Sequence, residues 1–355
     1  MKIEPPIDHA ALIQQISSAY GLPVTALTFV PLGEVGIAYV VDCADGRRYF
    51  AKLLPGSRQG RSQQAKLGVY LPITYELYER GLFRNLPCPI ATSAGALHDR
   101  FGEYALTLFR YIEGQTLPYD TATYPKPVRD QLARAIATIH RATHLLISPL
   151  PPAAAFEMRF ADDLRRGLAA LNLIGPLHRP GQIALRDLLL PRRDALLDRL
   201  ADTEQLADTA RARATSLVLC HTDMGGDNNM VDAAGRVYIL DWEDITLAPP
   251  EHDLQTFSDR HFADFLTVYQ QAGGATALDP LQFAFYFQRR YLVDLTDWLI
   301  RILYENTDPL QDVHDLAGIQ SECLNKLDNF TVQIANITQM LAQAAESGTN
   351  RADVV

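Results

Sequence analysis

The sequence predicts an α+β protein with two lobes, a small β-rich N-terminal lobe and a larger, mainly helical C-terminal lobe. Residues 1–112 alternate short apolar strands with glycine turns, whereas helical periodicity dominates residues 113–355. The segment 113–115 (Glu-Gly-Gln) reads as a hinge between the two parts. The length of 355 residues also suits two packed units better than one small core.

The predicted N-terminal lobe begins with a helix followed by three strands. Apolar residues recur at helical spacing over residues 10–20, and Gly21 ends this helix. The strands are expected at residues 27–30, 37–41 and 49–53. Asp45-Gly46 forms a tight turn before the third strand, because this pair accepts positive φ angles.

Further elements follow in order along the chain. Residues 56–65 read as a mobile polar loop and residues 64–80 as a helix kinked at Pro72. A hairpin over residues 90–112 ends in the apolar strand 104–109. Helices are expected at residues 128–143, 159–171, 183–200, 282–304 and 319–344, with one short β region at residues 217–240. The first of these helices carries Leu132, Ile136 and Ile139 on one apolar face, which predicts a core helix.

Composition and charge exclude several classes of function. Hydrophobic residues make up 48% and charged residues 21%, as in ordinary globular enzymes. The N-terminus lacks the pattern of a signal peptide, and no apolar run is long enough to span a membrane. Four cysteines stand far apart without a CxxC pair, which indicates reduced thiols and a cytoplasmic protein. A net charge of −10 disfavours nucleic acids and favours a cationic small molecule.

The short β region carries a motif suited to phosphoryl transfer. His221-x-Asp223-x4-Asn228 precedes a turn at Ala234-Gly235 and an apolar strand that ends in Asp241. Charge in this reaction develops on phosphate oxygens, so catalysis depends on positioning and on metal electrostatics. Asp223 suits the catalytic base, while Asn228 and Asp241 suit oxygen ligands of Mg²⁺. A hairpin between Asn228 and Asp241 would bring these two ligands side by side. A lone His-x-Asp is often a loop cap, yet a carboxylate ending an apolar strand is costly without a metal or partner.

A second set of residues in the N-terminal lobe suits nucleotide binding. Lys52 lies on an otherwise apolar strand, where its natural partner is the phosphate chain of ATP. Gly33 and Gly36, two strands earlier, fit a loop that covers phosphates. Tyr111 and Ile112 stand at the lobe boundary, where an adenine would bind. A surface lysine, an ordinary hairpin and an apolar linker are the alternatives for these three features.

The order of these motifs resembles that of aminoglycoside phosphotransferases and their choline-kinase-like relatives. The resemblance covers residues 29–300. The stretches LCHTD (219–223), ILDWED (239–244) and LAPPEHDL (247–254) most resemble the spectinomycin phosphotransferase branch. This likeness implies a bilobal, protein-kinase-like fold and an enzyme that uses ATP and Mg²⁺ to phosphorylate a hydroxyl of a small molecule.

The resemblance also implies roles for single residues. It makes Asp223 the base, Asn228 and Asp241 the magnesium ligands, and Lys52 the ATP-phosphate lysine. It assigns structural roles to two further residues, His140 and Asp253.

The sequence departs from relatives at several positions. Gly225 stands where many carry histidine, and Asp227 stands where relatives often carry glycine. No acid lies in the first half of the predicted helix 64–80, and Glu76 and Glu79 come late in it. The acidic partner expected for Lys52 is therefore not obvious, and Lys52 either lacks the ion pair or uses another residue.

Acidic residues are the candidates for binding a cationic substrate. Glu243 and Asp244 directly follow the predicted metal ligand. Asp294 and Asp297 share a face of the helix 282–304, although Arg290 is spaced to pair with Asp294. These residues predict an aminoglycoside or aminocyclitol-like substrate.

Three alternatives remain beside an antibiotic kinase. Choline-like or amino-sugar metabolites fit an acidic site equally well. A non-catalytic, kinase-like binding protein would not need the intact set of Asp223, Asn228 and Asp241. A metal-dependent hydrolase built on His221, Asp223 and Asp241 would leave Lys52 without a role.

Overall fold

A computed structural model describes residues 4–31 and 35–352, with side chains up to residue 343. The chain divides into two compact units. The first contains the chain up to Pro152, Val218–Leu247 and Asp264–Ala275, and the second contains Ala153–Leu217, Ala248–Ala263 and the chain from Thr276 onward. The predicted N-terminal lobe and the motif at residues 221–241 therefore belong to one compact unit.

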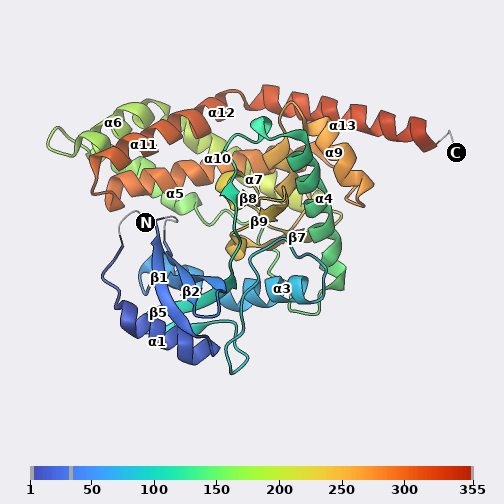
Figure 1. Cartoon of the computed structure of the whole chain (residues 1–355). Coiled ribbons are helices and arrows are strands. Elements are labelled where there is room, and N and C mark those ends of the chain that lie inside the picture. Colours follow the sequence, from blue (N-terminus) through green and yellow to red (C-terminus); the bar gives the residue numbers. More distant parts are fainter. Residues whose placement is uncertain (1–3, 32–34, 353–355) are drawn as a thin grey trace. The chain divides into compact units, whose positions relative to one another are not determined.

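A five-stranded antiparallel sheet forms the N-terminal part of the first unit (Figure 1). Its strands, in spatial order, are β1 (Val24–Val30), β2 (Ile37–Cys43), β3 (Arg48–Leu54), β5 (Tyr104–Arg110) and β4 (Asp99–Phe101). The turn between β2 and β3 contains Gly46 with a φ of 79°, which confirms the predicted Asp-Gly turn. The alternation of apolar residues and the turn chemistry thus predict this sheet correctly.

Helix α1 (His9–Tyr20) packs on this sheet through one apolar face. Leu12, Ile16 and Tyr20 are buried against β2, β3 and β5. Gly21 ends the helix in the left-handed conformation with a φ of 66°, as expected. This core fixes β3, the strand that carries Lys52.

Two separate helices follow β3, instead of a polar loop and one kinked helix. Helix α2 (Arg58–Gln64) begins because the Ser57 side chain accepts a hydrogen bond from the Gly60 amide at 3.2 Å. Helix α3 (Leu67–Glu79) contains Pro72. Residues 58–64, within the segment predicted to be a mobile loop, are therefore helical because Ser57 caps them.

The rest of the first unit is built around two small sheets. One has the strand order β6 (Gln115–Thr116), β8 (Asn229–Val231) and β9 (Val237–Ile239), and the other pairs β7 (Val218–Cys220) with β10 (Thr246–Ala248). Helix α4 (Lys126–Ala142) packs against β7 and buries the predicted apolar face of Leu132, Ile136 and Ile139 completely.

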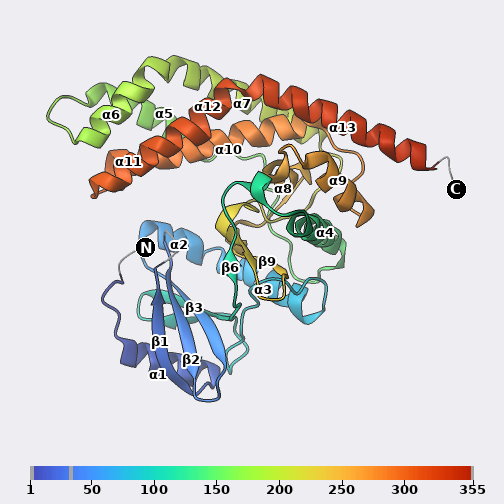
Figure 2. The same ribbon diagram turned by 45° about the horizontal axis from the view of Figure 1, so that its top comes forward.

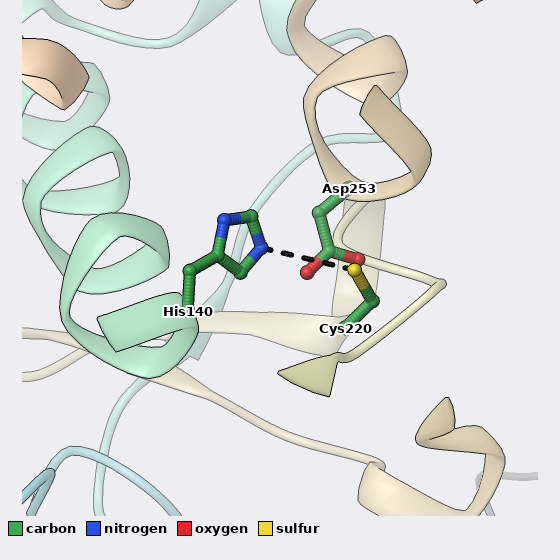
Figure 3. A group of neighbouring side chains, drawn as sticks. All are labelled: His140, Cys220 and Asp253. Carbon is green, nitrogen blue, oxygen red and sulfur yellow. Dashed lines mark hydrogen bonds between the residues drawn. The ribbon is translucent and has the colours of Figure 1, made fainter. Parts of the chain in front are cut away.

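His140 joins α4 to its neighbours in this unit. Its Nδ1 lies 2.9 Å from the hydroxyl of Tyr269 on α9 (Phe262–Gln271). Its Nε2 lies 3.9 Å from the Cys220 sulfur at the end of β7 (Figure 3). The imidazole is only 3% exposed, so it is placed as a packing and hydrogen-bonding residue of the core.

The second unit is mainly helical (Figure 2). Its helices are α5 (Ala161–Ala170), α6 (Pro180–Leu189), α7 (Arg193–Arg213), α8 (Glu251–Leu254), α10 (Pro280–Ile300), α11 (Pro309–Gly318), α12 (Asn325–Asp328) and α13 (Phe330–Ala352). The single helix predicted at residues 183–200 is two helices, α6 and α7, separated by a 3₁₀ turn that contains Pro191. Among the described residues, no helix is both long and apolar enough to cross a membrane.

Candidate active site

The β8–β9 hairpin brings Asn228 and Asp241 to the same end of the small sheet. Asn229 pairs with Ile239 in the ladder, and the Leu240 amide donates to the Asn228 carbonyl at 2.8 Å. Asn228 thus accepts the last of these hydrogen bonds, and Asp241 directly follows its donor, Leu240. The sequence predicted this adjacency from the short turn between the two strands.

His221 fastens the loop before Asp223 to the end of β9. Its Nε2 lies 2.7 Å from the Leu240 carbonyl oxygen, so this nitrogen carries the proton and donates it. The Asp223 amide donates to the other ring nitrogen at 3.4 Å. The ring is fully buried and meets the Trp242 indole edge-on, with centroids 5.1 Å apart. His221 therefore positions the loop and does not need to react.

Asn228 is hydrogen-bonded directly to Asp223. The Asn228 amide nitrogen donates to the Asp223 backbone carbonyl and to its carboxylate oxygen Oδ2, both at 3.0 Å. Because the amide nitrogen is engaged, the amide oxygen is the atom of Asn228 suited to a cation. The same contact orients the half-buried Asp223 carboxylate.

Two residues of this segment have an unusual backbone. Thr222 and Asp241, with φ angles of 77° and 59°, are the residues other than glycine with positive φ among those that the structure describes. A β-branched residue rarely adopts this conformation. The Thr222 hydroxyl donates to the Asp244 carbonyl at 3.2 Å, which helps to hold it. Backbone strain of about 1–3 kcal/mol at each position is typical of functional sites.

Lys52 extends from β3 to the same place. Its ammonium lies 3.1 Å from Asp241 Oδ1 and also binds Glu243 Oε1. A Cβ atom on Gly36 would lie 2.8 Å from Lys52 Cε, so glycine at this position leaves room for the lysine side chain. The other glycine predicted to cover phosphates, Gly33, lies outside the described residues.

The electrostatics of this cluster follow from two carboxylates that share one ammonium. Burial lowers the pKa of Lys52, but Asp241 and Glu243 outweigh it, and the net pKa is raised. Burial raises the pKa of Asp241, yet the nearby Lys52 holds it well below its usual range. Burial raises the pKa of Glu243, Lys52 opposes this, and the neighbouring Asp241 adds to the rise. Lys52 thus stays a cation and Asp241 an anion at neutral pH.

Glu76 of α3 does not contact Lys52. Its carboxylate accepts hydrogen bonds from the Ile147 and Ser148 amides at 2.8 and 2.7 Å and binds Arg80. Burial raises the pKa of Glu76, but these bonds outweigh burial and lower the pKa to about 2, from an ordinary value of 4.5. Glu76 therefore links helix α3 to the loop that follows α4.

We expect Glu76→Gln to lower the free energy of unfolding by about 1–3 kcal/mol at pH 7, because charged hydrogen bonds to two amides are weakened. The folded-state pKa lies below the unfolded value. The ionised group therefore stabilises the fold above pH 4.5, and this contribution is lost as the pH falls towards 2. Urea titrations at pH 7 and pH 3 measure both effects. Glu79→Gln, an exposed residue of the same helix, is the matched control. Equal unfolding free energies for Glu76→Gln and wild type at pH 7 would refute this role.

The predicted substrate acids are found in different surroundings. Glu243 was expected to face a substrate, but its side chain is only 7% exposed and lies against Lys52. Asp244 is exposed and binds Lys66. Asp294 on α10 binds Arg290 at 2.9 Å, and Asp297 on the same helix is exposed. Of these four acids, Glu243 directly contacts a predicted site residue, Lys52.

Tyr111 and Ile112 lie in the short segment between β5 and β6. Both side chains are half-buried. The Arg48 guanidinium stacks on the Tyr111 ring, 4.4 Å from its centroid, and binds Glu113 at 3.0 Å. The segment is thus tied to the end of β3, the strand of Lys52.

Comparisons with known proteins agree with this architecture. A spectinomycin phosphotransferase, crystallised with ADP and spectinomycin, superposes with a TM-score of 0.70 at 17% identity, over 89% of this chain and 94% of that one. An aminoglycoside phosphotransferase from Alicyclobacillus acidocaldarius gives 0.56 at 17% identity, over 97% of each chain. Choline kinase from Streptococcus pneumoniae gives 0.51 at 17% identity, over 94% of this chain and 98% of that one.

These likenesses confirm the predicted fold, a kinase-like arrangement with an N-terminal antiparallel sheet and a mostly helical C-terminal part. No curated protein matches the sequence. The model of the phosphotransferase enzyme family matches residues 17–290.

Proposed function

Because this chain belongs to the phosphotransferase enzyme family, we propose that it transfers the γ-phosphate of ATP to a hydroxyl of an aminoglycoside or aminocyclitol-like molecule. The observation that carries this proposal is the convergence of a candidate proton acceptor, two candidate oxygen ligands and a half-buried lysine within one compact unit. These residues are Asp223, Asn228, Asp241 and Lys52. ATP as the donor also favours a cytoplasmic location.

Asp223 would act as the catalytic base. Its carboxylate orients the attacking hydroxyl and accepts the proton as the new O–P bond forms. The hydrogen bond from Asn228 to Oδ2 orients this carboxylate. His221 and the strained Thr222 backbone set the direction of this side chain.

The donor set fits a magnesium ion. Asn228 supplies an amide oxygen and Asp241 a carboxylate, both hard oxygen ligands at one end of a hairpin. Asn228 and Asp241 would hold Mg²⁺, which neutralises charge on the phosphates when bound. Lys52 would bind the nucleotide phosphates through its ammonium, since it already lies beside Asp241.

A cationic substrate agrees with the net charge of −10. The exposed acid Asp244 follows the site directly, and Asp294 and Asp297 on α10 stay predictions for substrate contacts. The choline kinase superposes at the same 17% identity as the spectinomycin phosphotransferase. A cellular amino alcohol or amino sugar is therefore the second candidate substrate.

A substrate panel in a coupled ADP-release assay tests this function. The panel contains aminocyclitols, aminoglycosides, choline analogues and amino sugars, each with and without Mg²⁺. Magnesium-dependent turnover of an aminocyclitol or aminoglycoside is the expected result. Turnover restricted to choline analogues or amino sugars would move the assignment to a metabolite kinase. Absence of both magnesium-dependent nucleotide binding and turnover would reject the kinase altogether.

A further inference from the structure

Helix α3 supplies no acid to Lys52. Glu76 is engaged with the loop at Ile147 and Ser148, and Glu79 is exposed. The α3 residue influenced by the lysine cluster is Tyr70, which is 3% exposed. Burial raises the pKa of its hydroxyl, and the charges of Glu243 and Asp241 add to the rise.

Glu243 binds Lys52 from a rigid turn. It lies in the 3₁₀ turn Trp242–Asp244, which packs against α3. Trp242 anchors this turn, because its indole nitrogen donates to the Ile239 carbonyl at 2.9 Å and its ring packs on His221. The position of the Glu243 backbone is therefore set by the same buried residues that position the catalytic loop.

The two carboxylates on Lys52 differ in exposure. The Asp241 side chain is 49% exposed, whereas that of Glu243 is 7% exposed. The open carboxylate suits a cation that arrives from solvent, and the enclosed one suits a permanent partner. A cation at Asp241 would also relieve the crowding of two carboxylates around one ammonium. Lys52 has three N–H donors, so one bond to Glu243 leaves the others for phosphate oxygens.

We propose that Glu243, and not an acid of α3, is the positioning residue that holds Lys52 in place for the nucleotide phosphates. This inference rests on the proposed function and deepens it. It also explains why α3 needs no acid in its first half. Glu243 acts through Lys52 and touches neither the phosphate nor the substrate.

Two substitutions of Glu243 separate a role of its carboxyl group in binding Lys52 from a packing role. Glu243→Gln keeps the shape and removes the carboxyl group, whereas Glu243→Asp keeps a carboxyl group on a shorter side chain. We expect Glu243→Gln to weaken Mg·ATP binding by about ten- to a hundredfold, the usual weight of a charged hydrogen bond, and Glu243→Asp to weaken it less. Isothermal titration calorimetry with the full chain measures this affinity without turnover. In steady-state assays the KM for ATP should rise more than kcat falls.

Glu79→Gln is the matched control, because it makes the same chemical change on α3. We expect wild-type affinity from it, and a comparable loss there would transfer the role to α3 and overturn the proposal. A Glu243→Gln protein with wild-type affinity would also overturn it. If Glu243→Asp lost more affinity than Glu243→Gln, Glu243 would be a packing residue.

Thermal unfolding of each variant checks that the loss is local. A folded Glu243→Gln protein with weakened nucleotide affinity supports the proposal. If Glu243→Gln does not fold, the Mg·ATP affinity of Glu243→Asp is compared with that of wild type and of Glu79→Gln. Wild-type affinity in Glu243→Asp would overturn the proposal, because the shorter side chain should not hold Lys52 in the same position. Failure of the wild-type protein to bind Mg·ATP would reject the proposed kinase function itself, which is a separate outcome.

Discussion

Asp223→Asn should lower kcat for phosphate transfer by about a thousandfold, within the usual range for loss of a general base. The substituted amide has the same shape and keeps the Asn228 nitrogen bonded to the backbone carbonyl of residue 223. It cannot accept the proton of the attacking hydroxyl. The affinity for Mg·ATP should stay close to that of wild type, because Lys52 and Asp241 are untouched. Single-turnover rates and calorimetric affinities measure the two effects separately.

The control for this variant is Asp227→Asn, four residues along the same segment. Asp227 is exposed, and its substitution removes the same charge without touching the carboxylate held by Asn228. We expect nearly unchanged turnover from it. If Asp223→Asn kept full turnover, or if both variants lost activity equally, Asp223 would not be the base.

Asp241→Asn should weaken the magnesium-dependent part of nucleotide binding by at least about a hundredfold, since changes to the supporting partners of metal ligands already cost ten- to a hundredfold. Asparagine is the appropriate replacement because residue 241 has a φ of 59°, which asparagine adopts more readily than alanine. Any loss then reports the missing charge and not backbone strain. Nucleotide titrations at a series of Mg²⁺ concentrations give the shift.

Nucleotide binding in EDTA provides the internal control for this second variant. In Asp241→Asn, Lys52 still binds Glu243, so the affinity for metal-free nucleotide should remain near that of wild type. An unaltered magnesium dependence in Asp241→Asn would contradict its assignment as a metal ligand. A loss of affinity that is equal with and without Mg²⁺ would instead indicate that Asp241 acts only by binding Lys52.

Local sequence signals determined much of the fold and the central motif. The alternation of apolar residues and the Asp-Gly turn predicted β2 and β3, and the apolar stripe of α4 predicted its buried face. The short turn before Asp241 predicted that it would lie beside Asn228. Periodicity and turn chemistry act over a few residues, so one sequence suffices to read them.

Two predicted elements differ from the structure at their boundaries. Ser57 is a good helix cap, yet the segment after it was predicted as a loop, and Pro191 separates two helices that were predicted as one. Both errors concern element boundaries, where capping competes with periodicity.

The tertiary structure alone decided which residues meet at Lys52. Asp241 and Glu243 follow it by 189 and 191 positions, and no periodicity connects residues so far apart. Glu243 and Asp244 are adjacent acids in sequence, but the anchored turn buries one against Lys52 and leaves the other exposed. The sequence by itself predicted a base, a pair of metal ligands and a phosphate lysine, in this order along the chain. Only the packing of the Trp242 turn against α3 assigned Glu243 to the lysine, because side-chain direction in a turn depends on its neighbours in space.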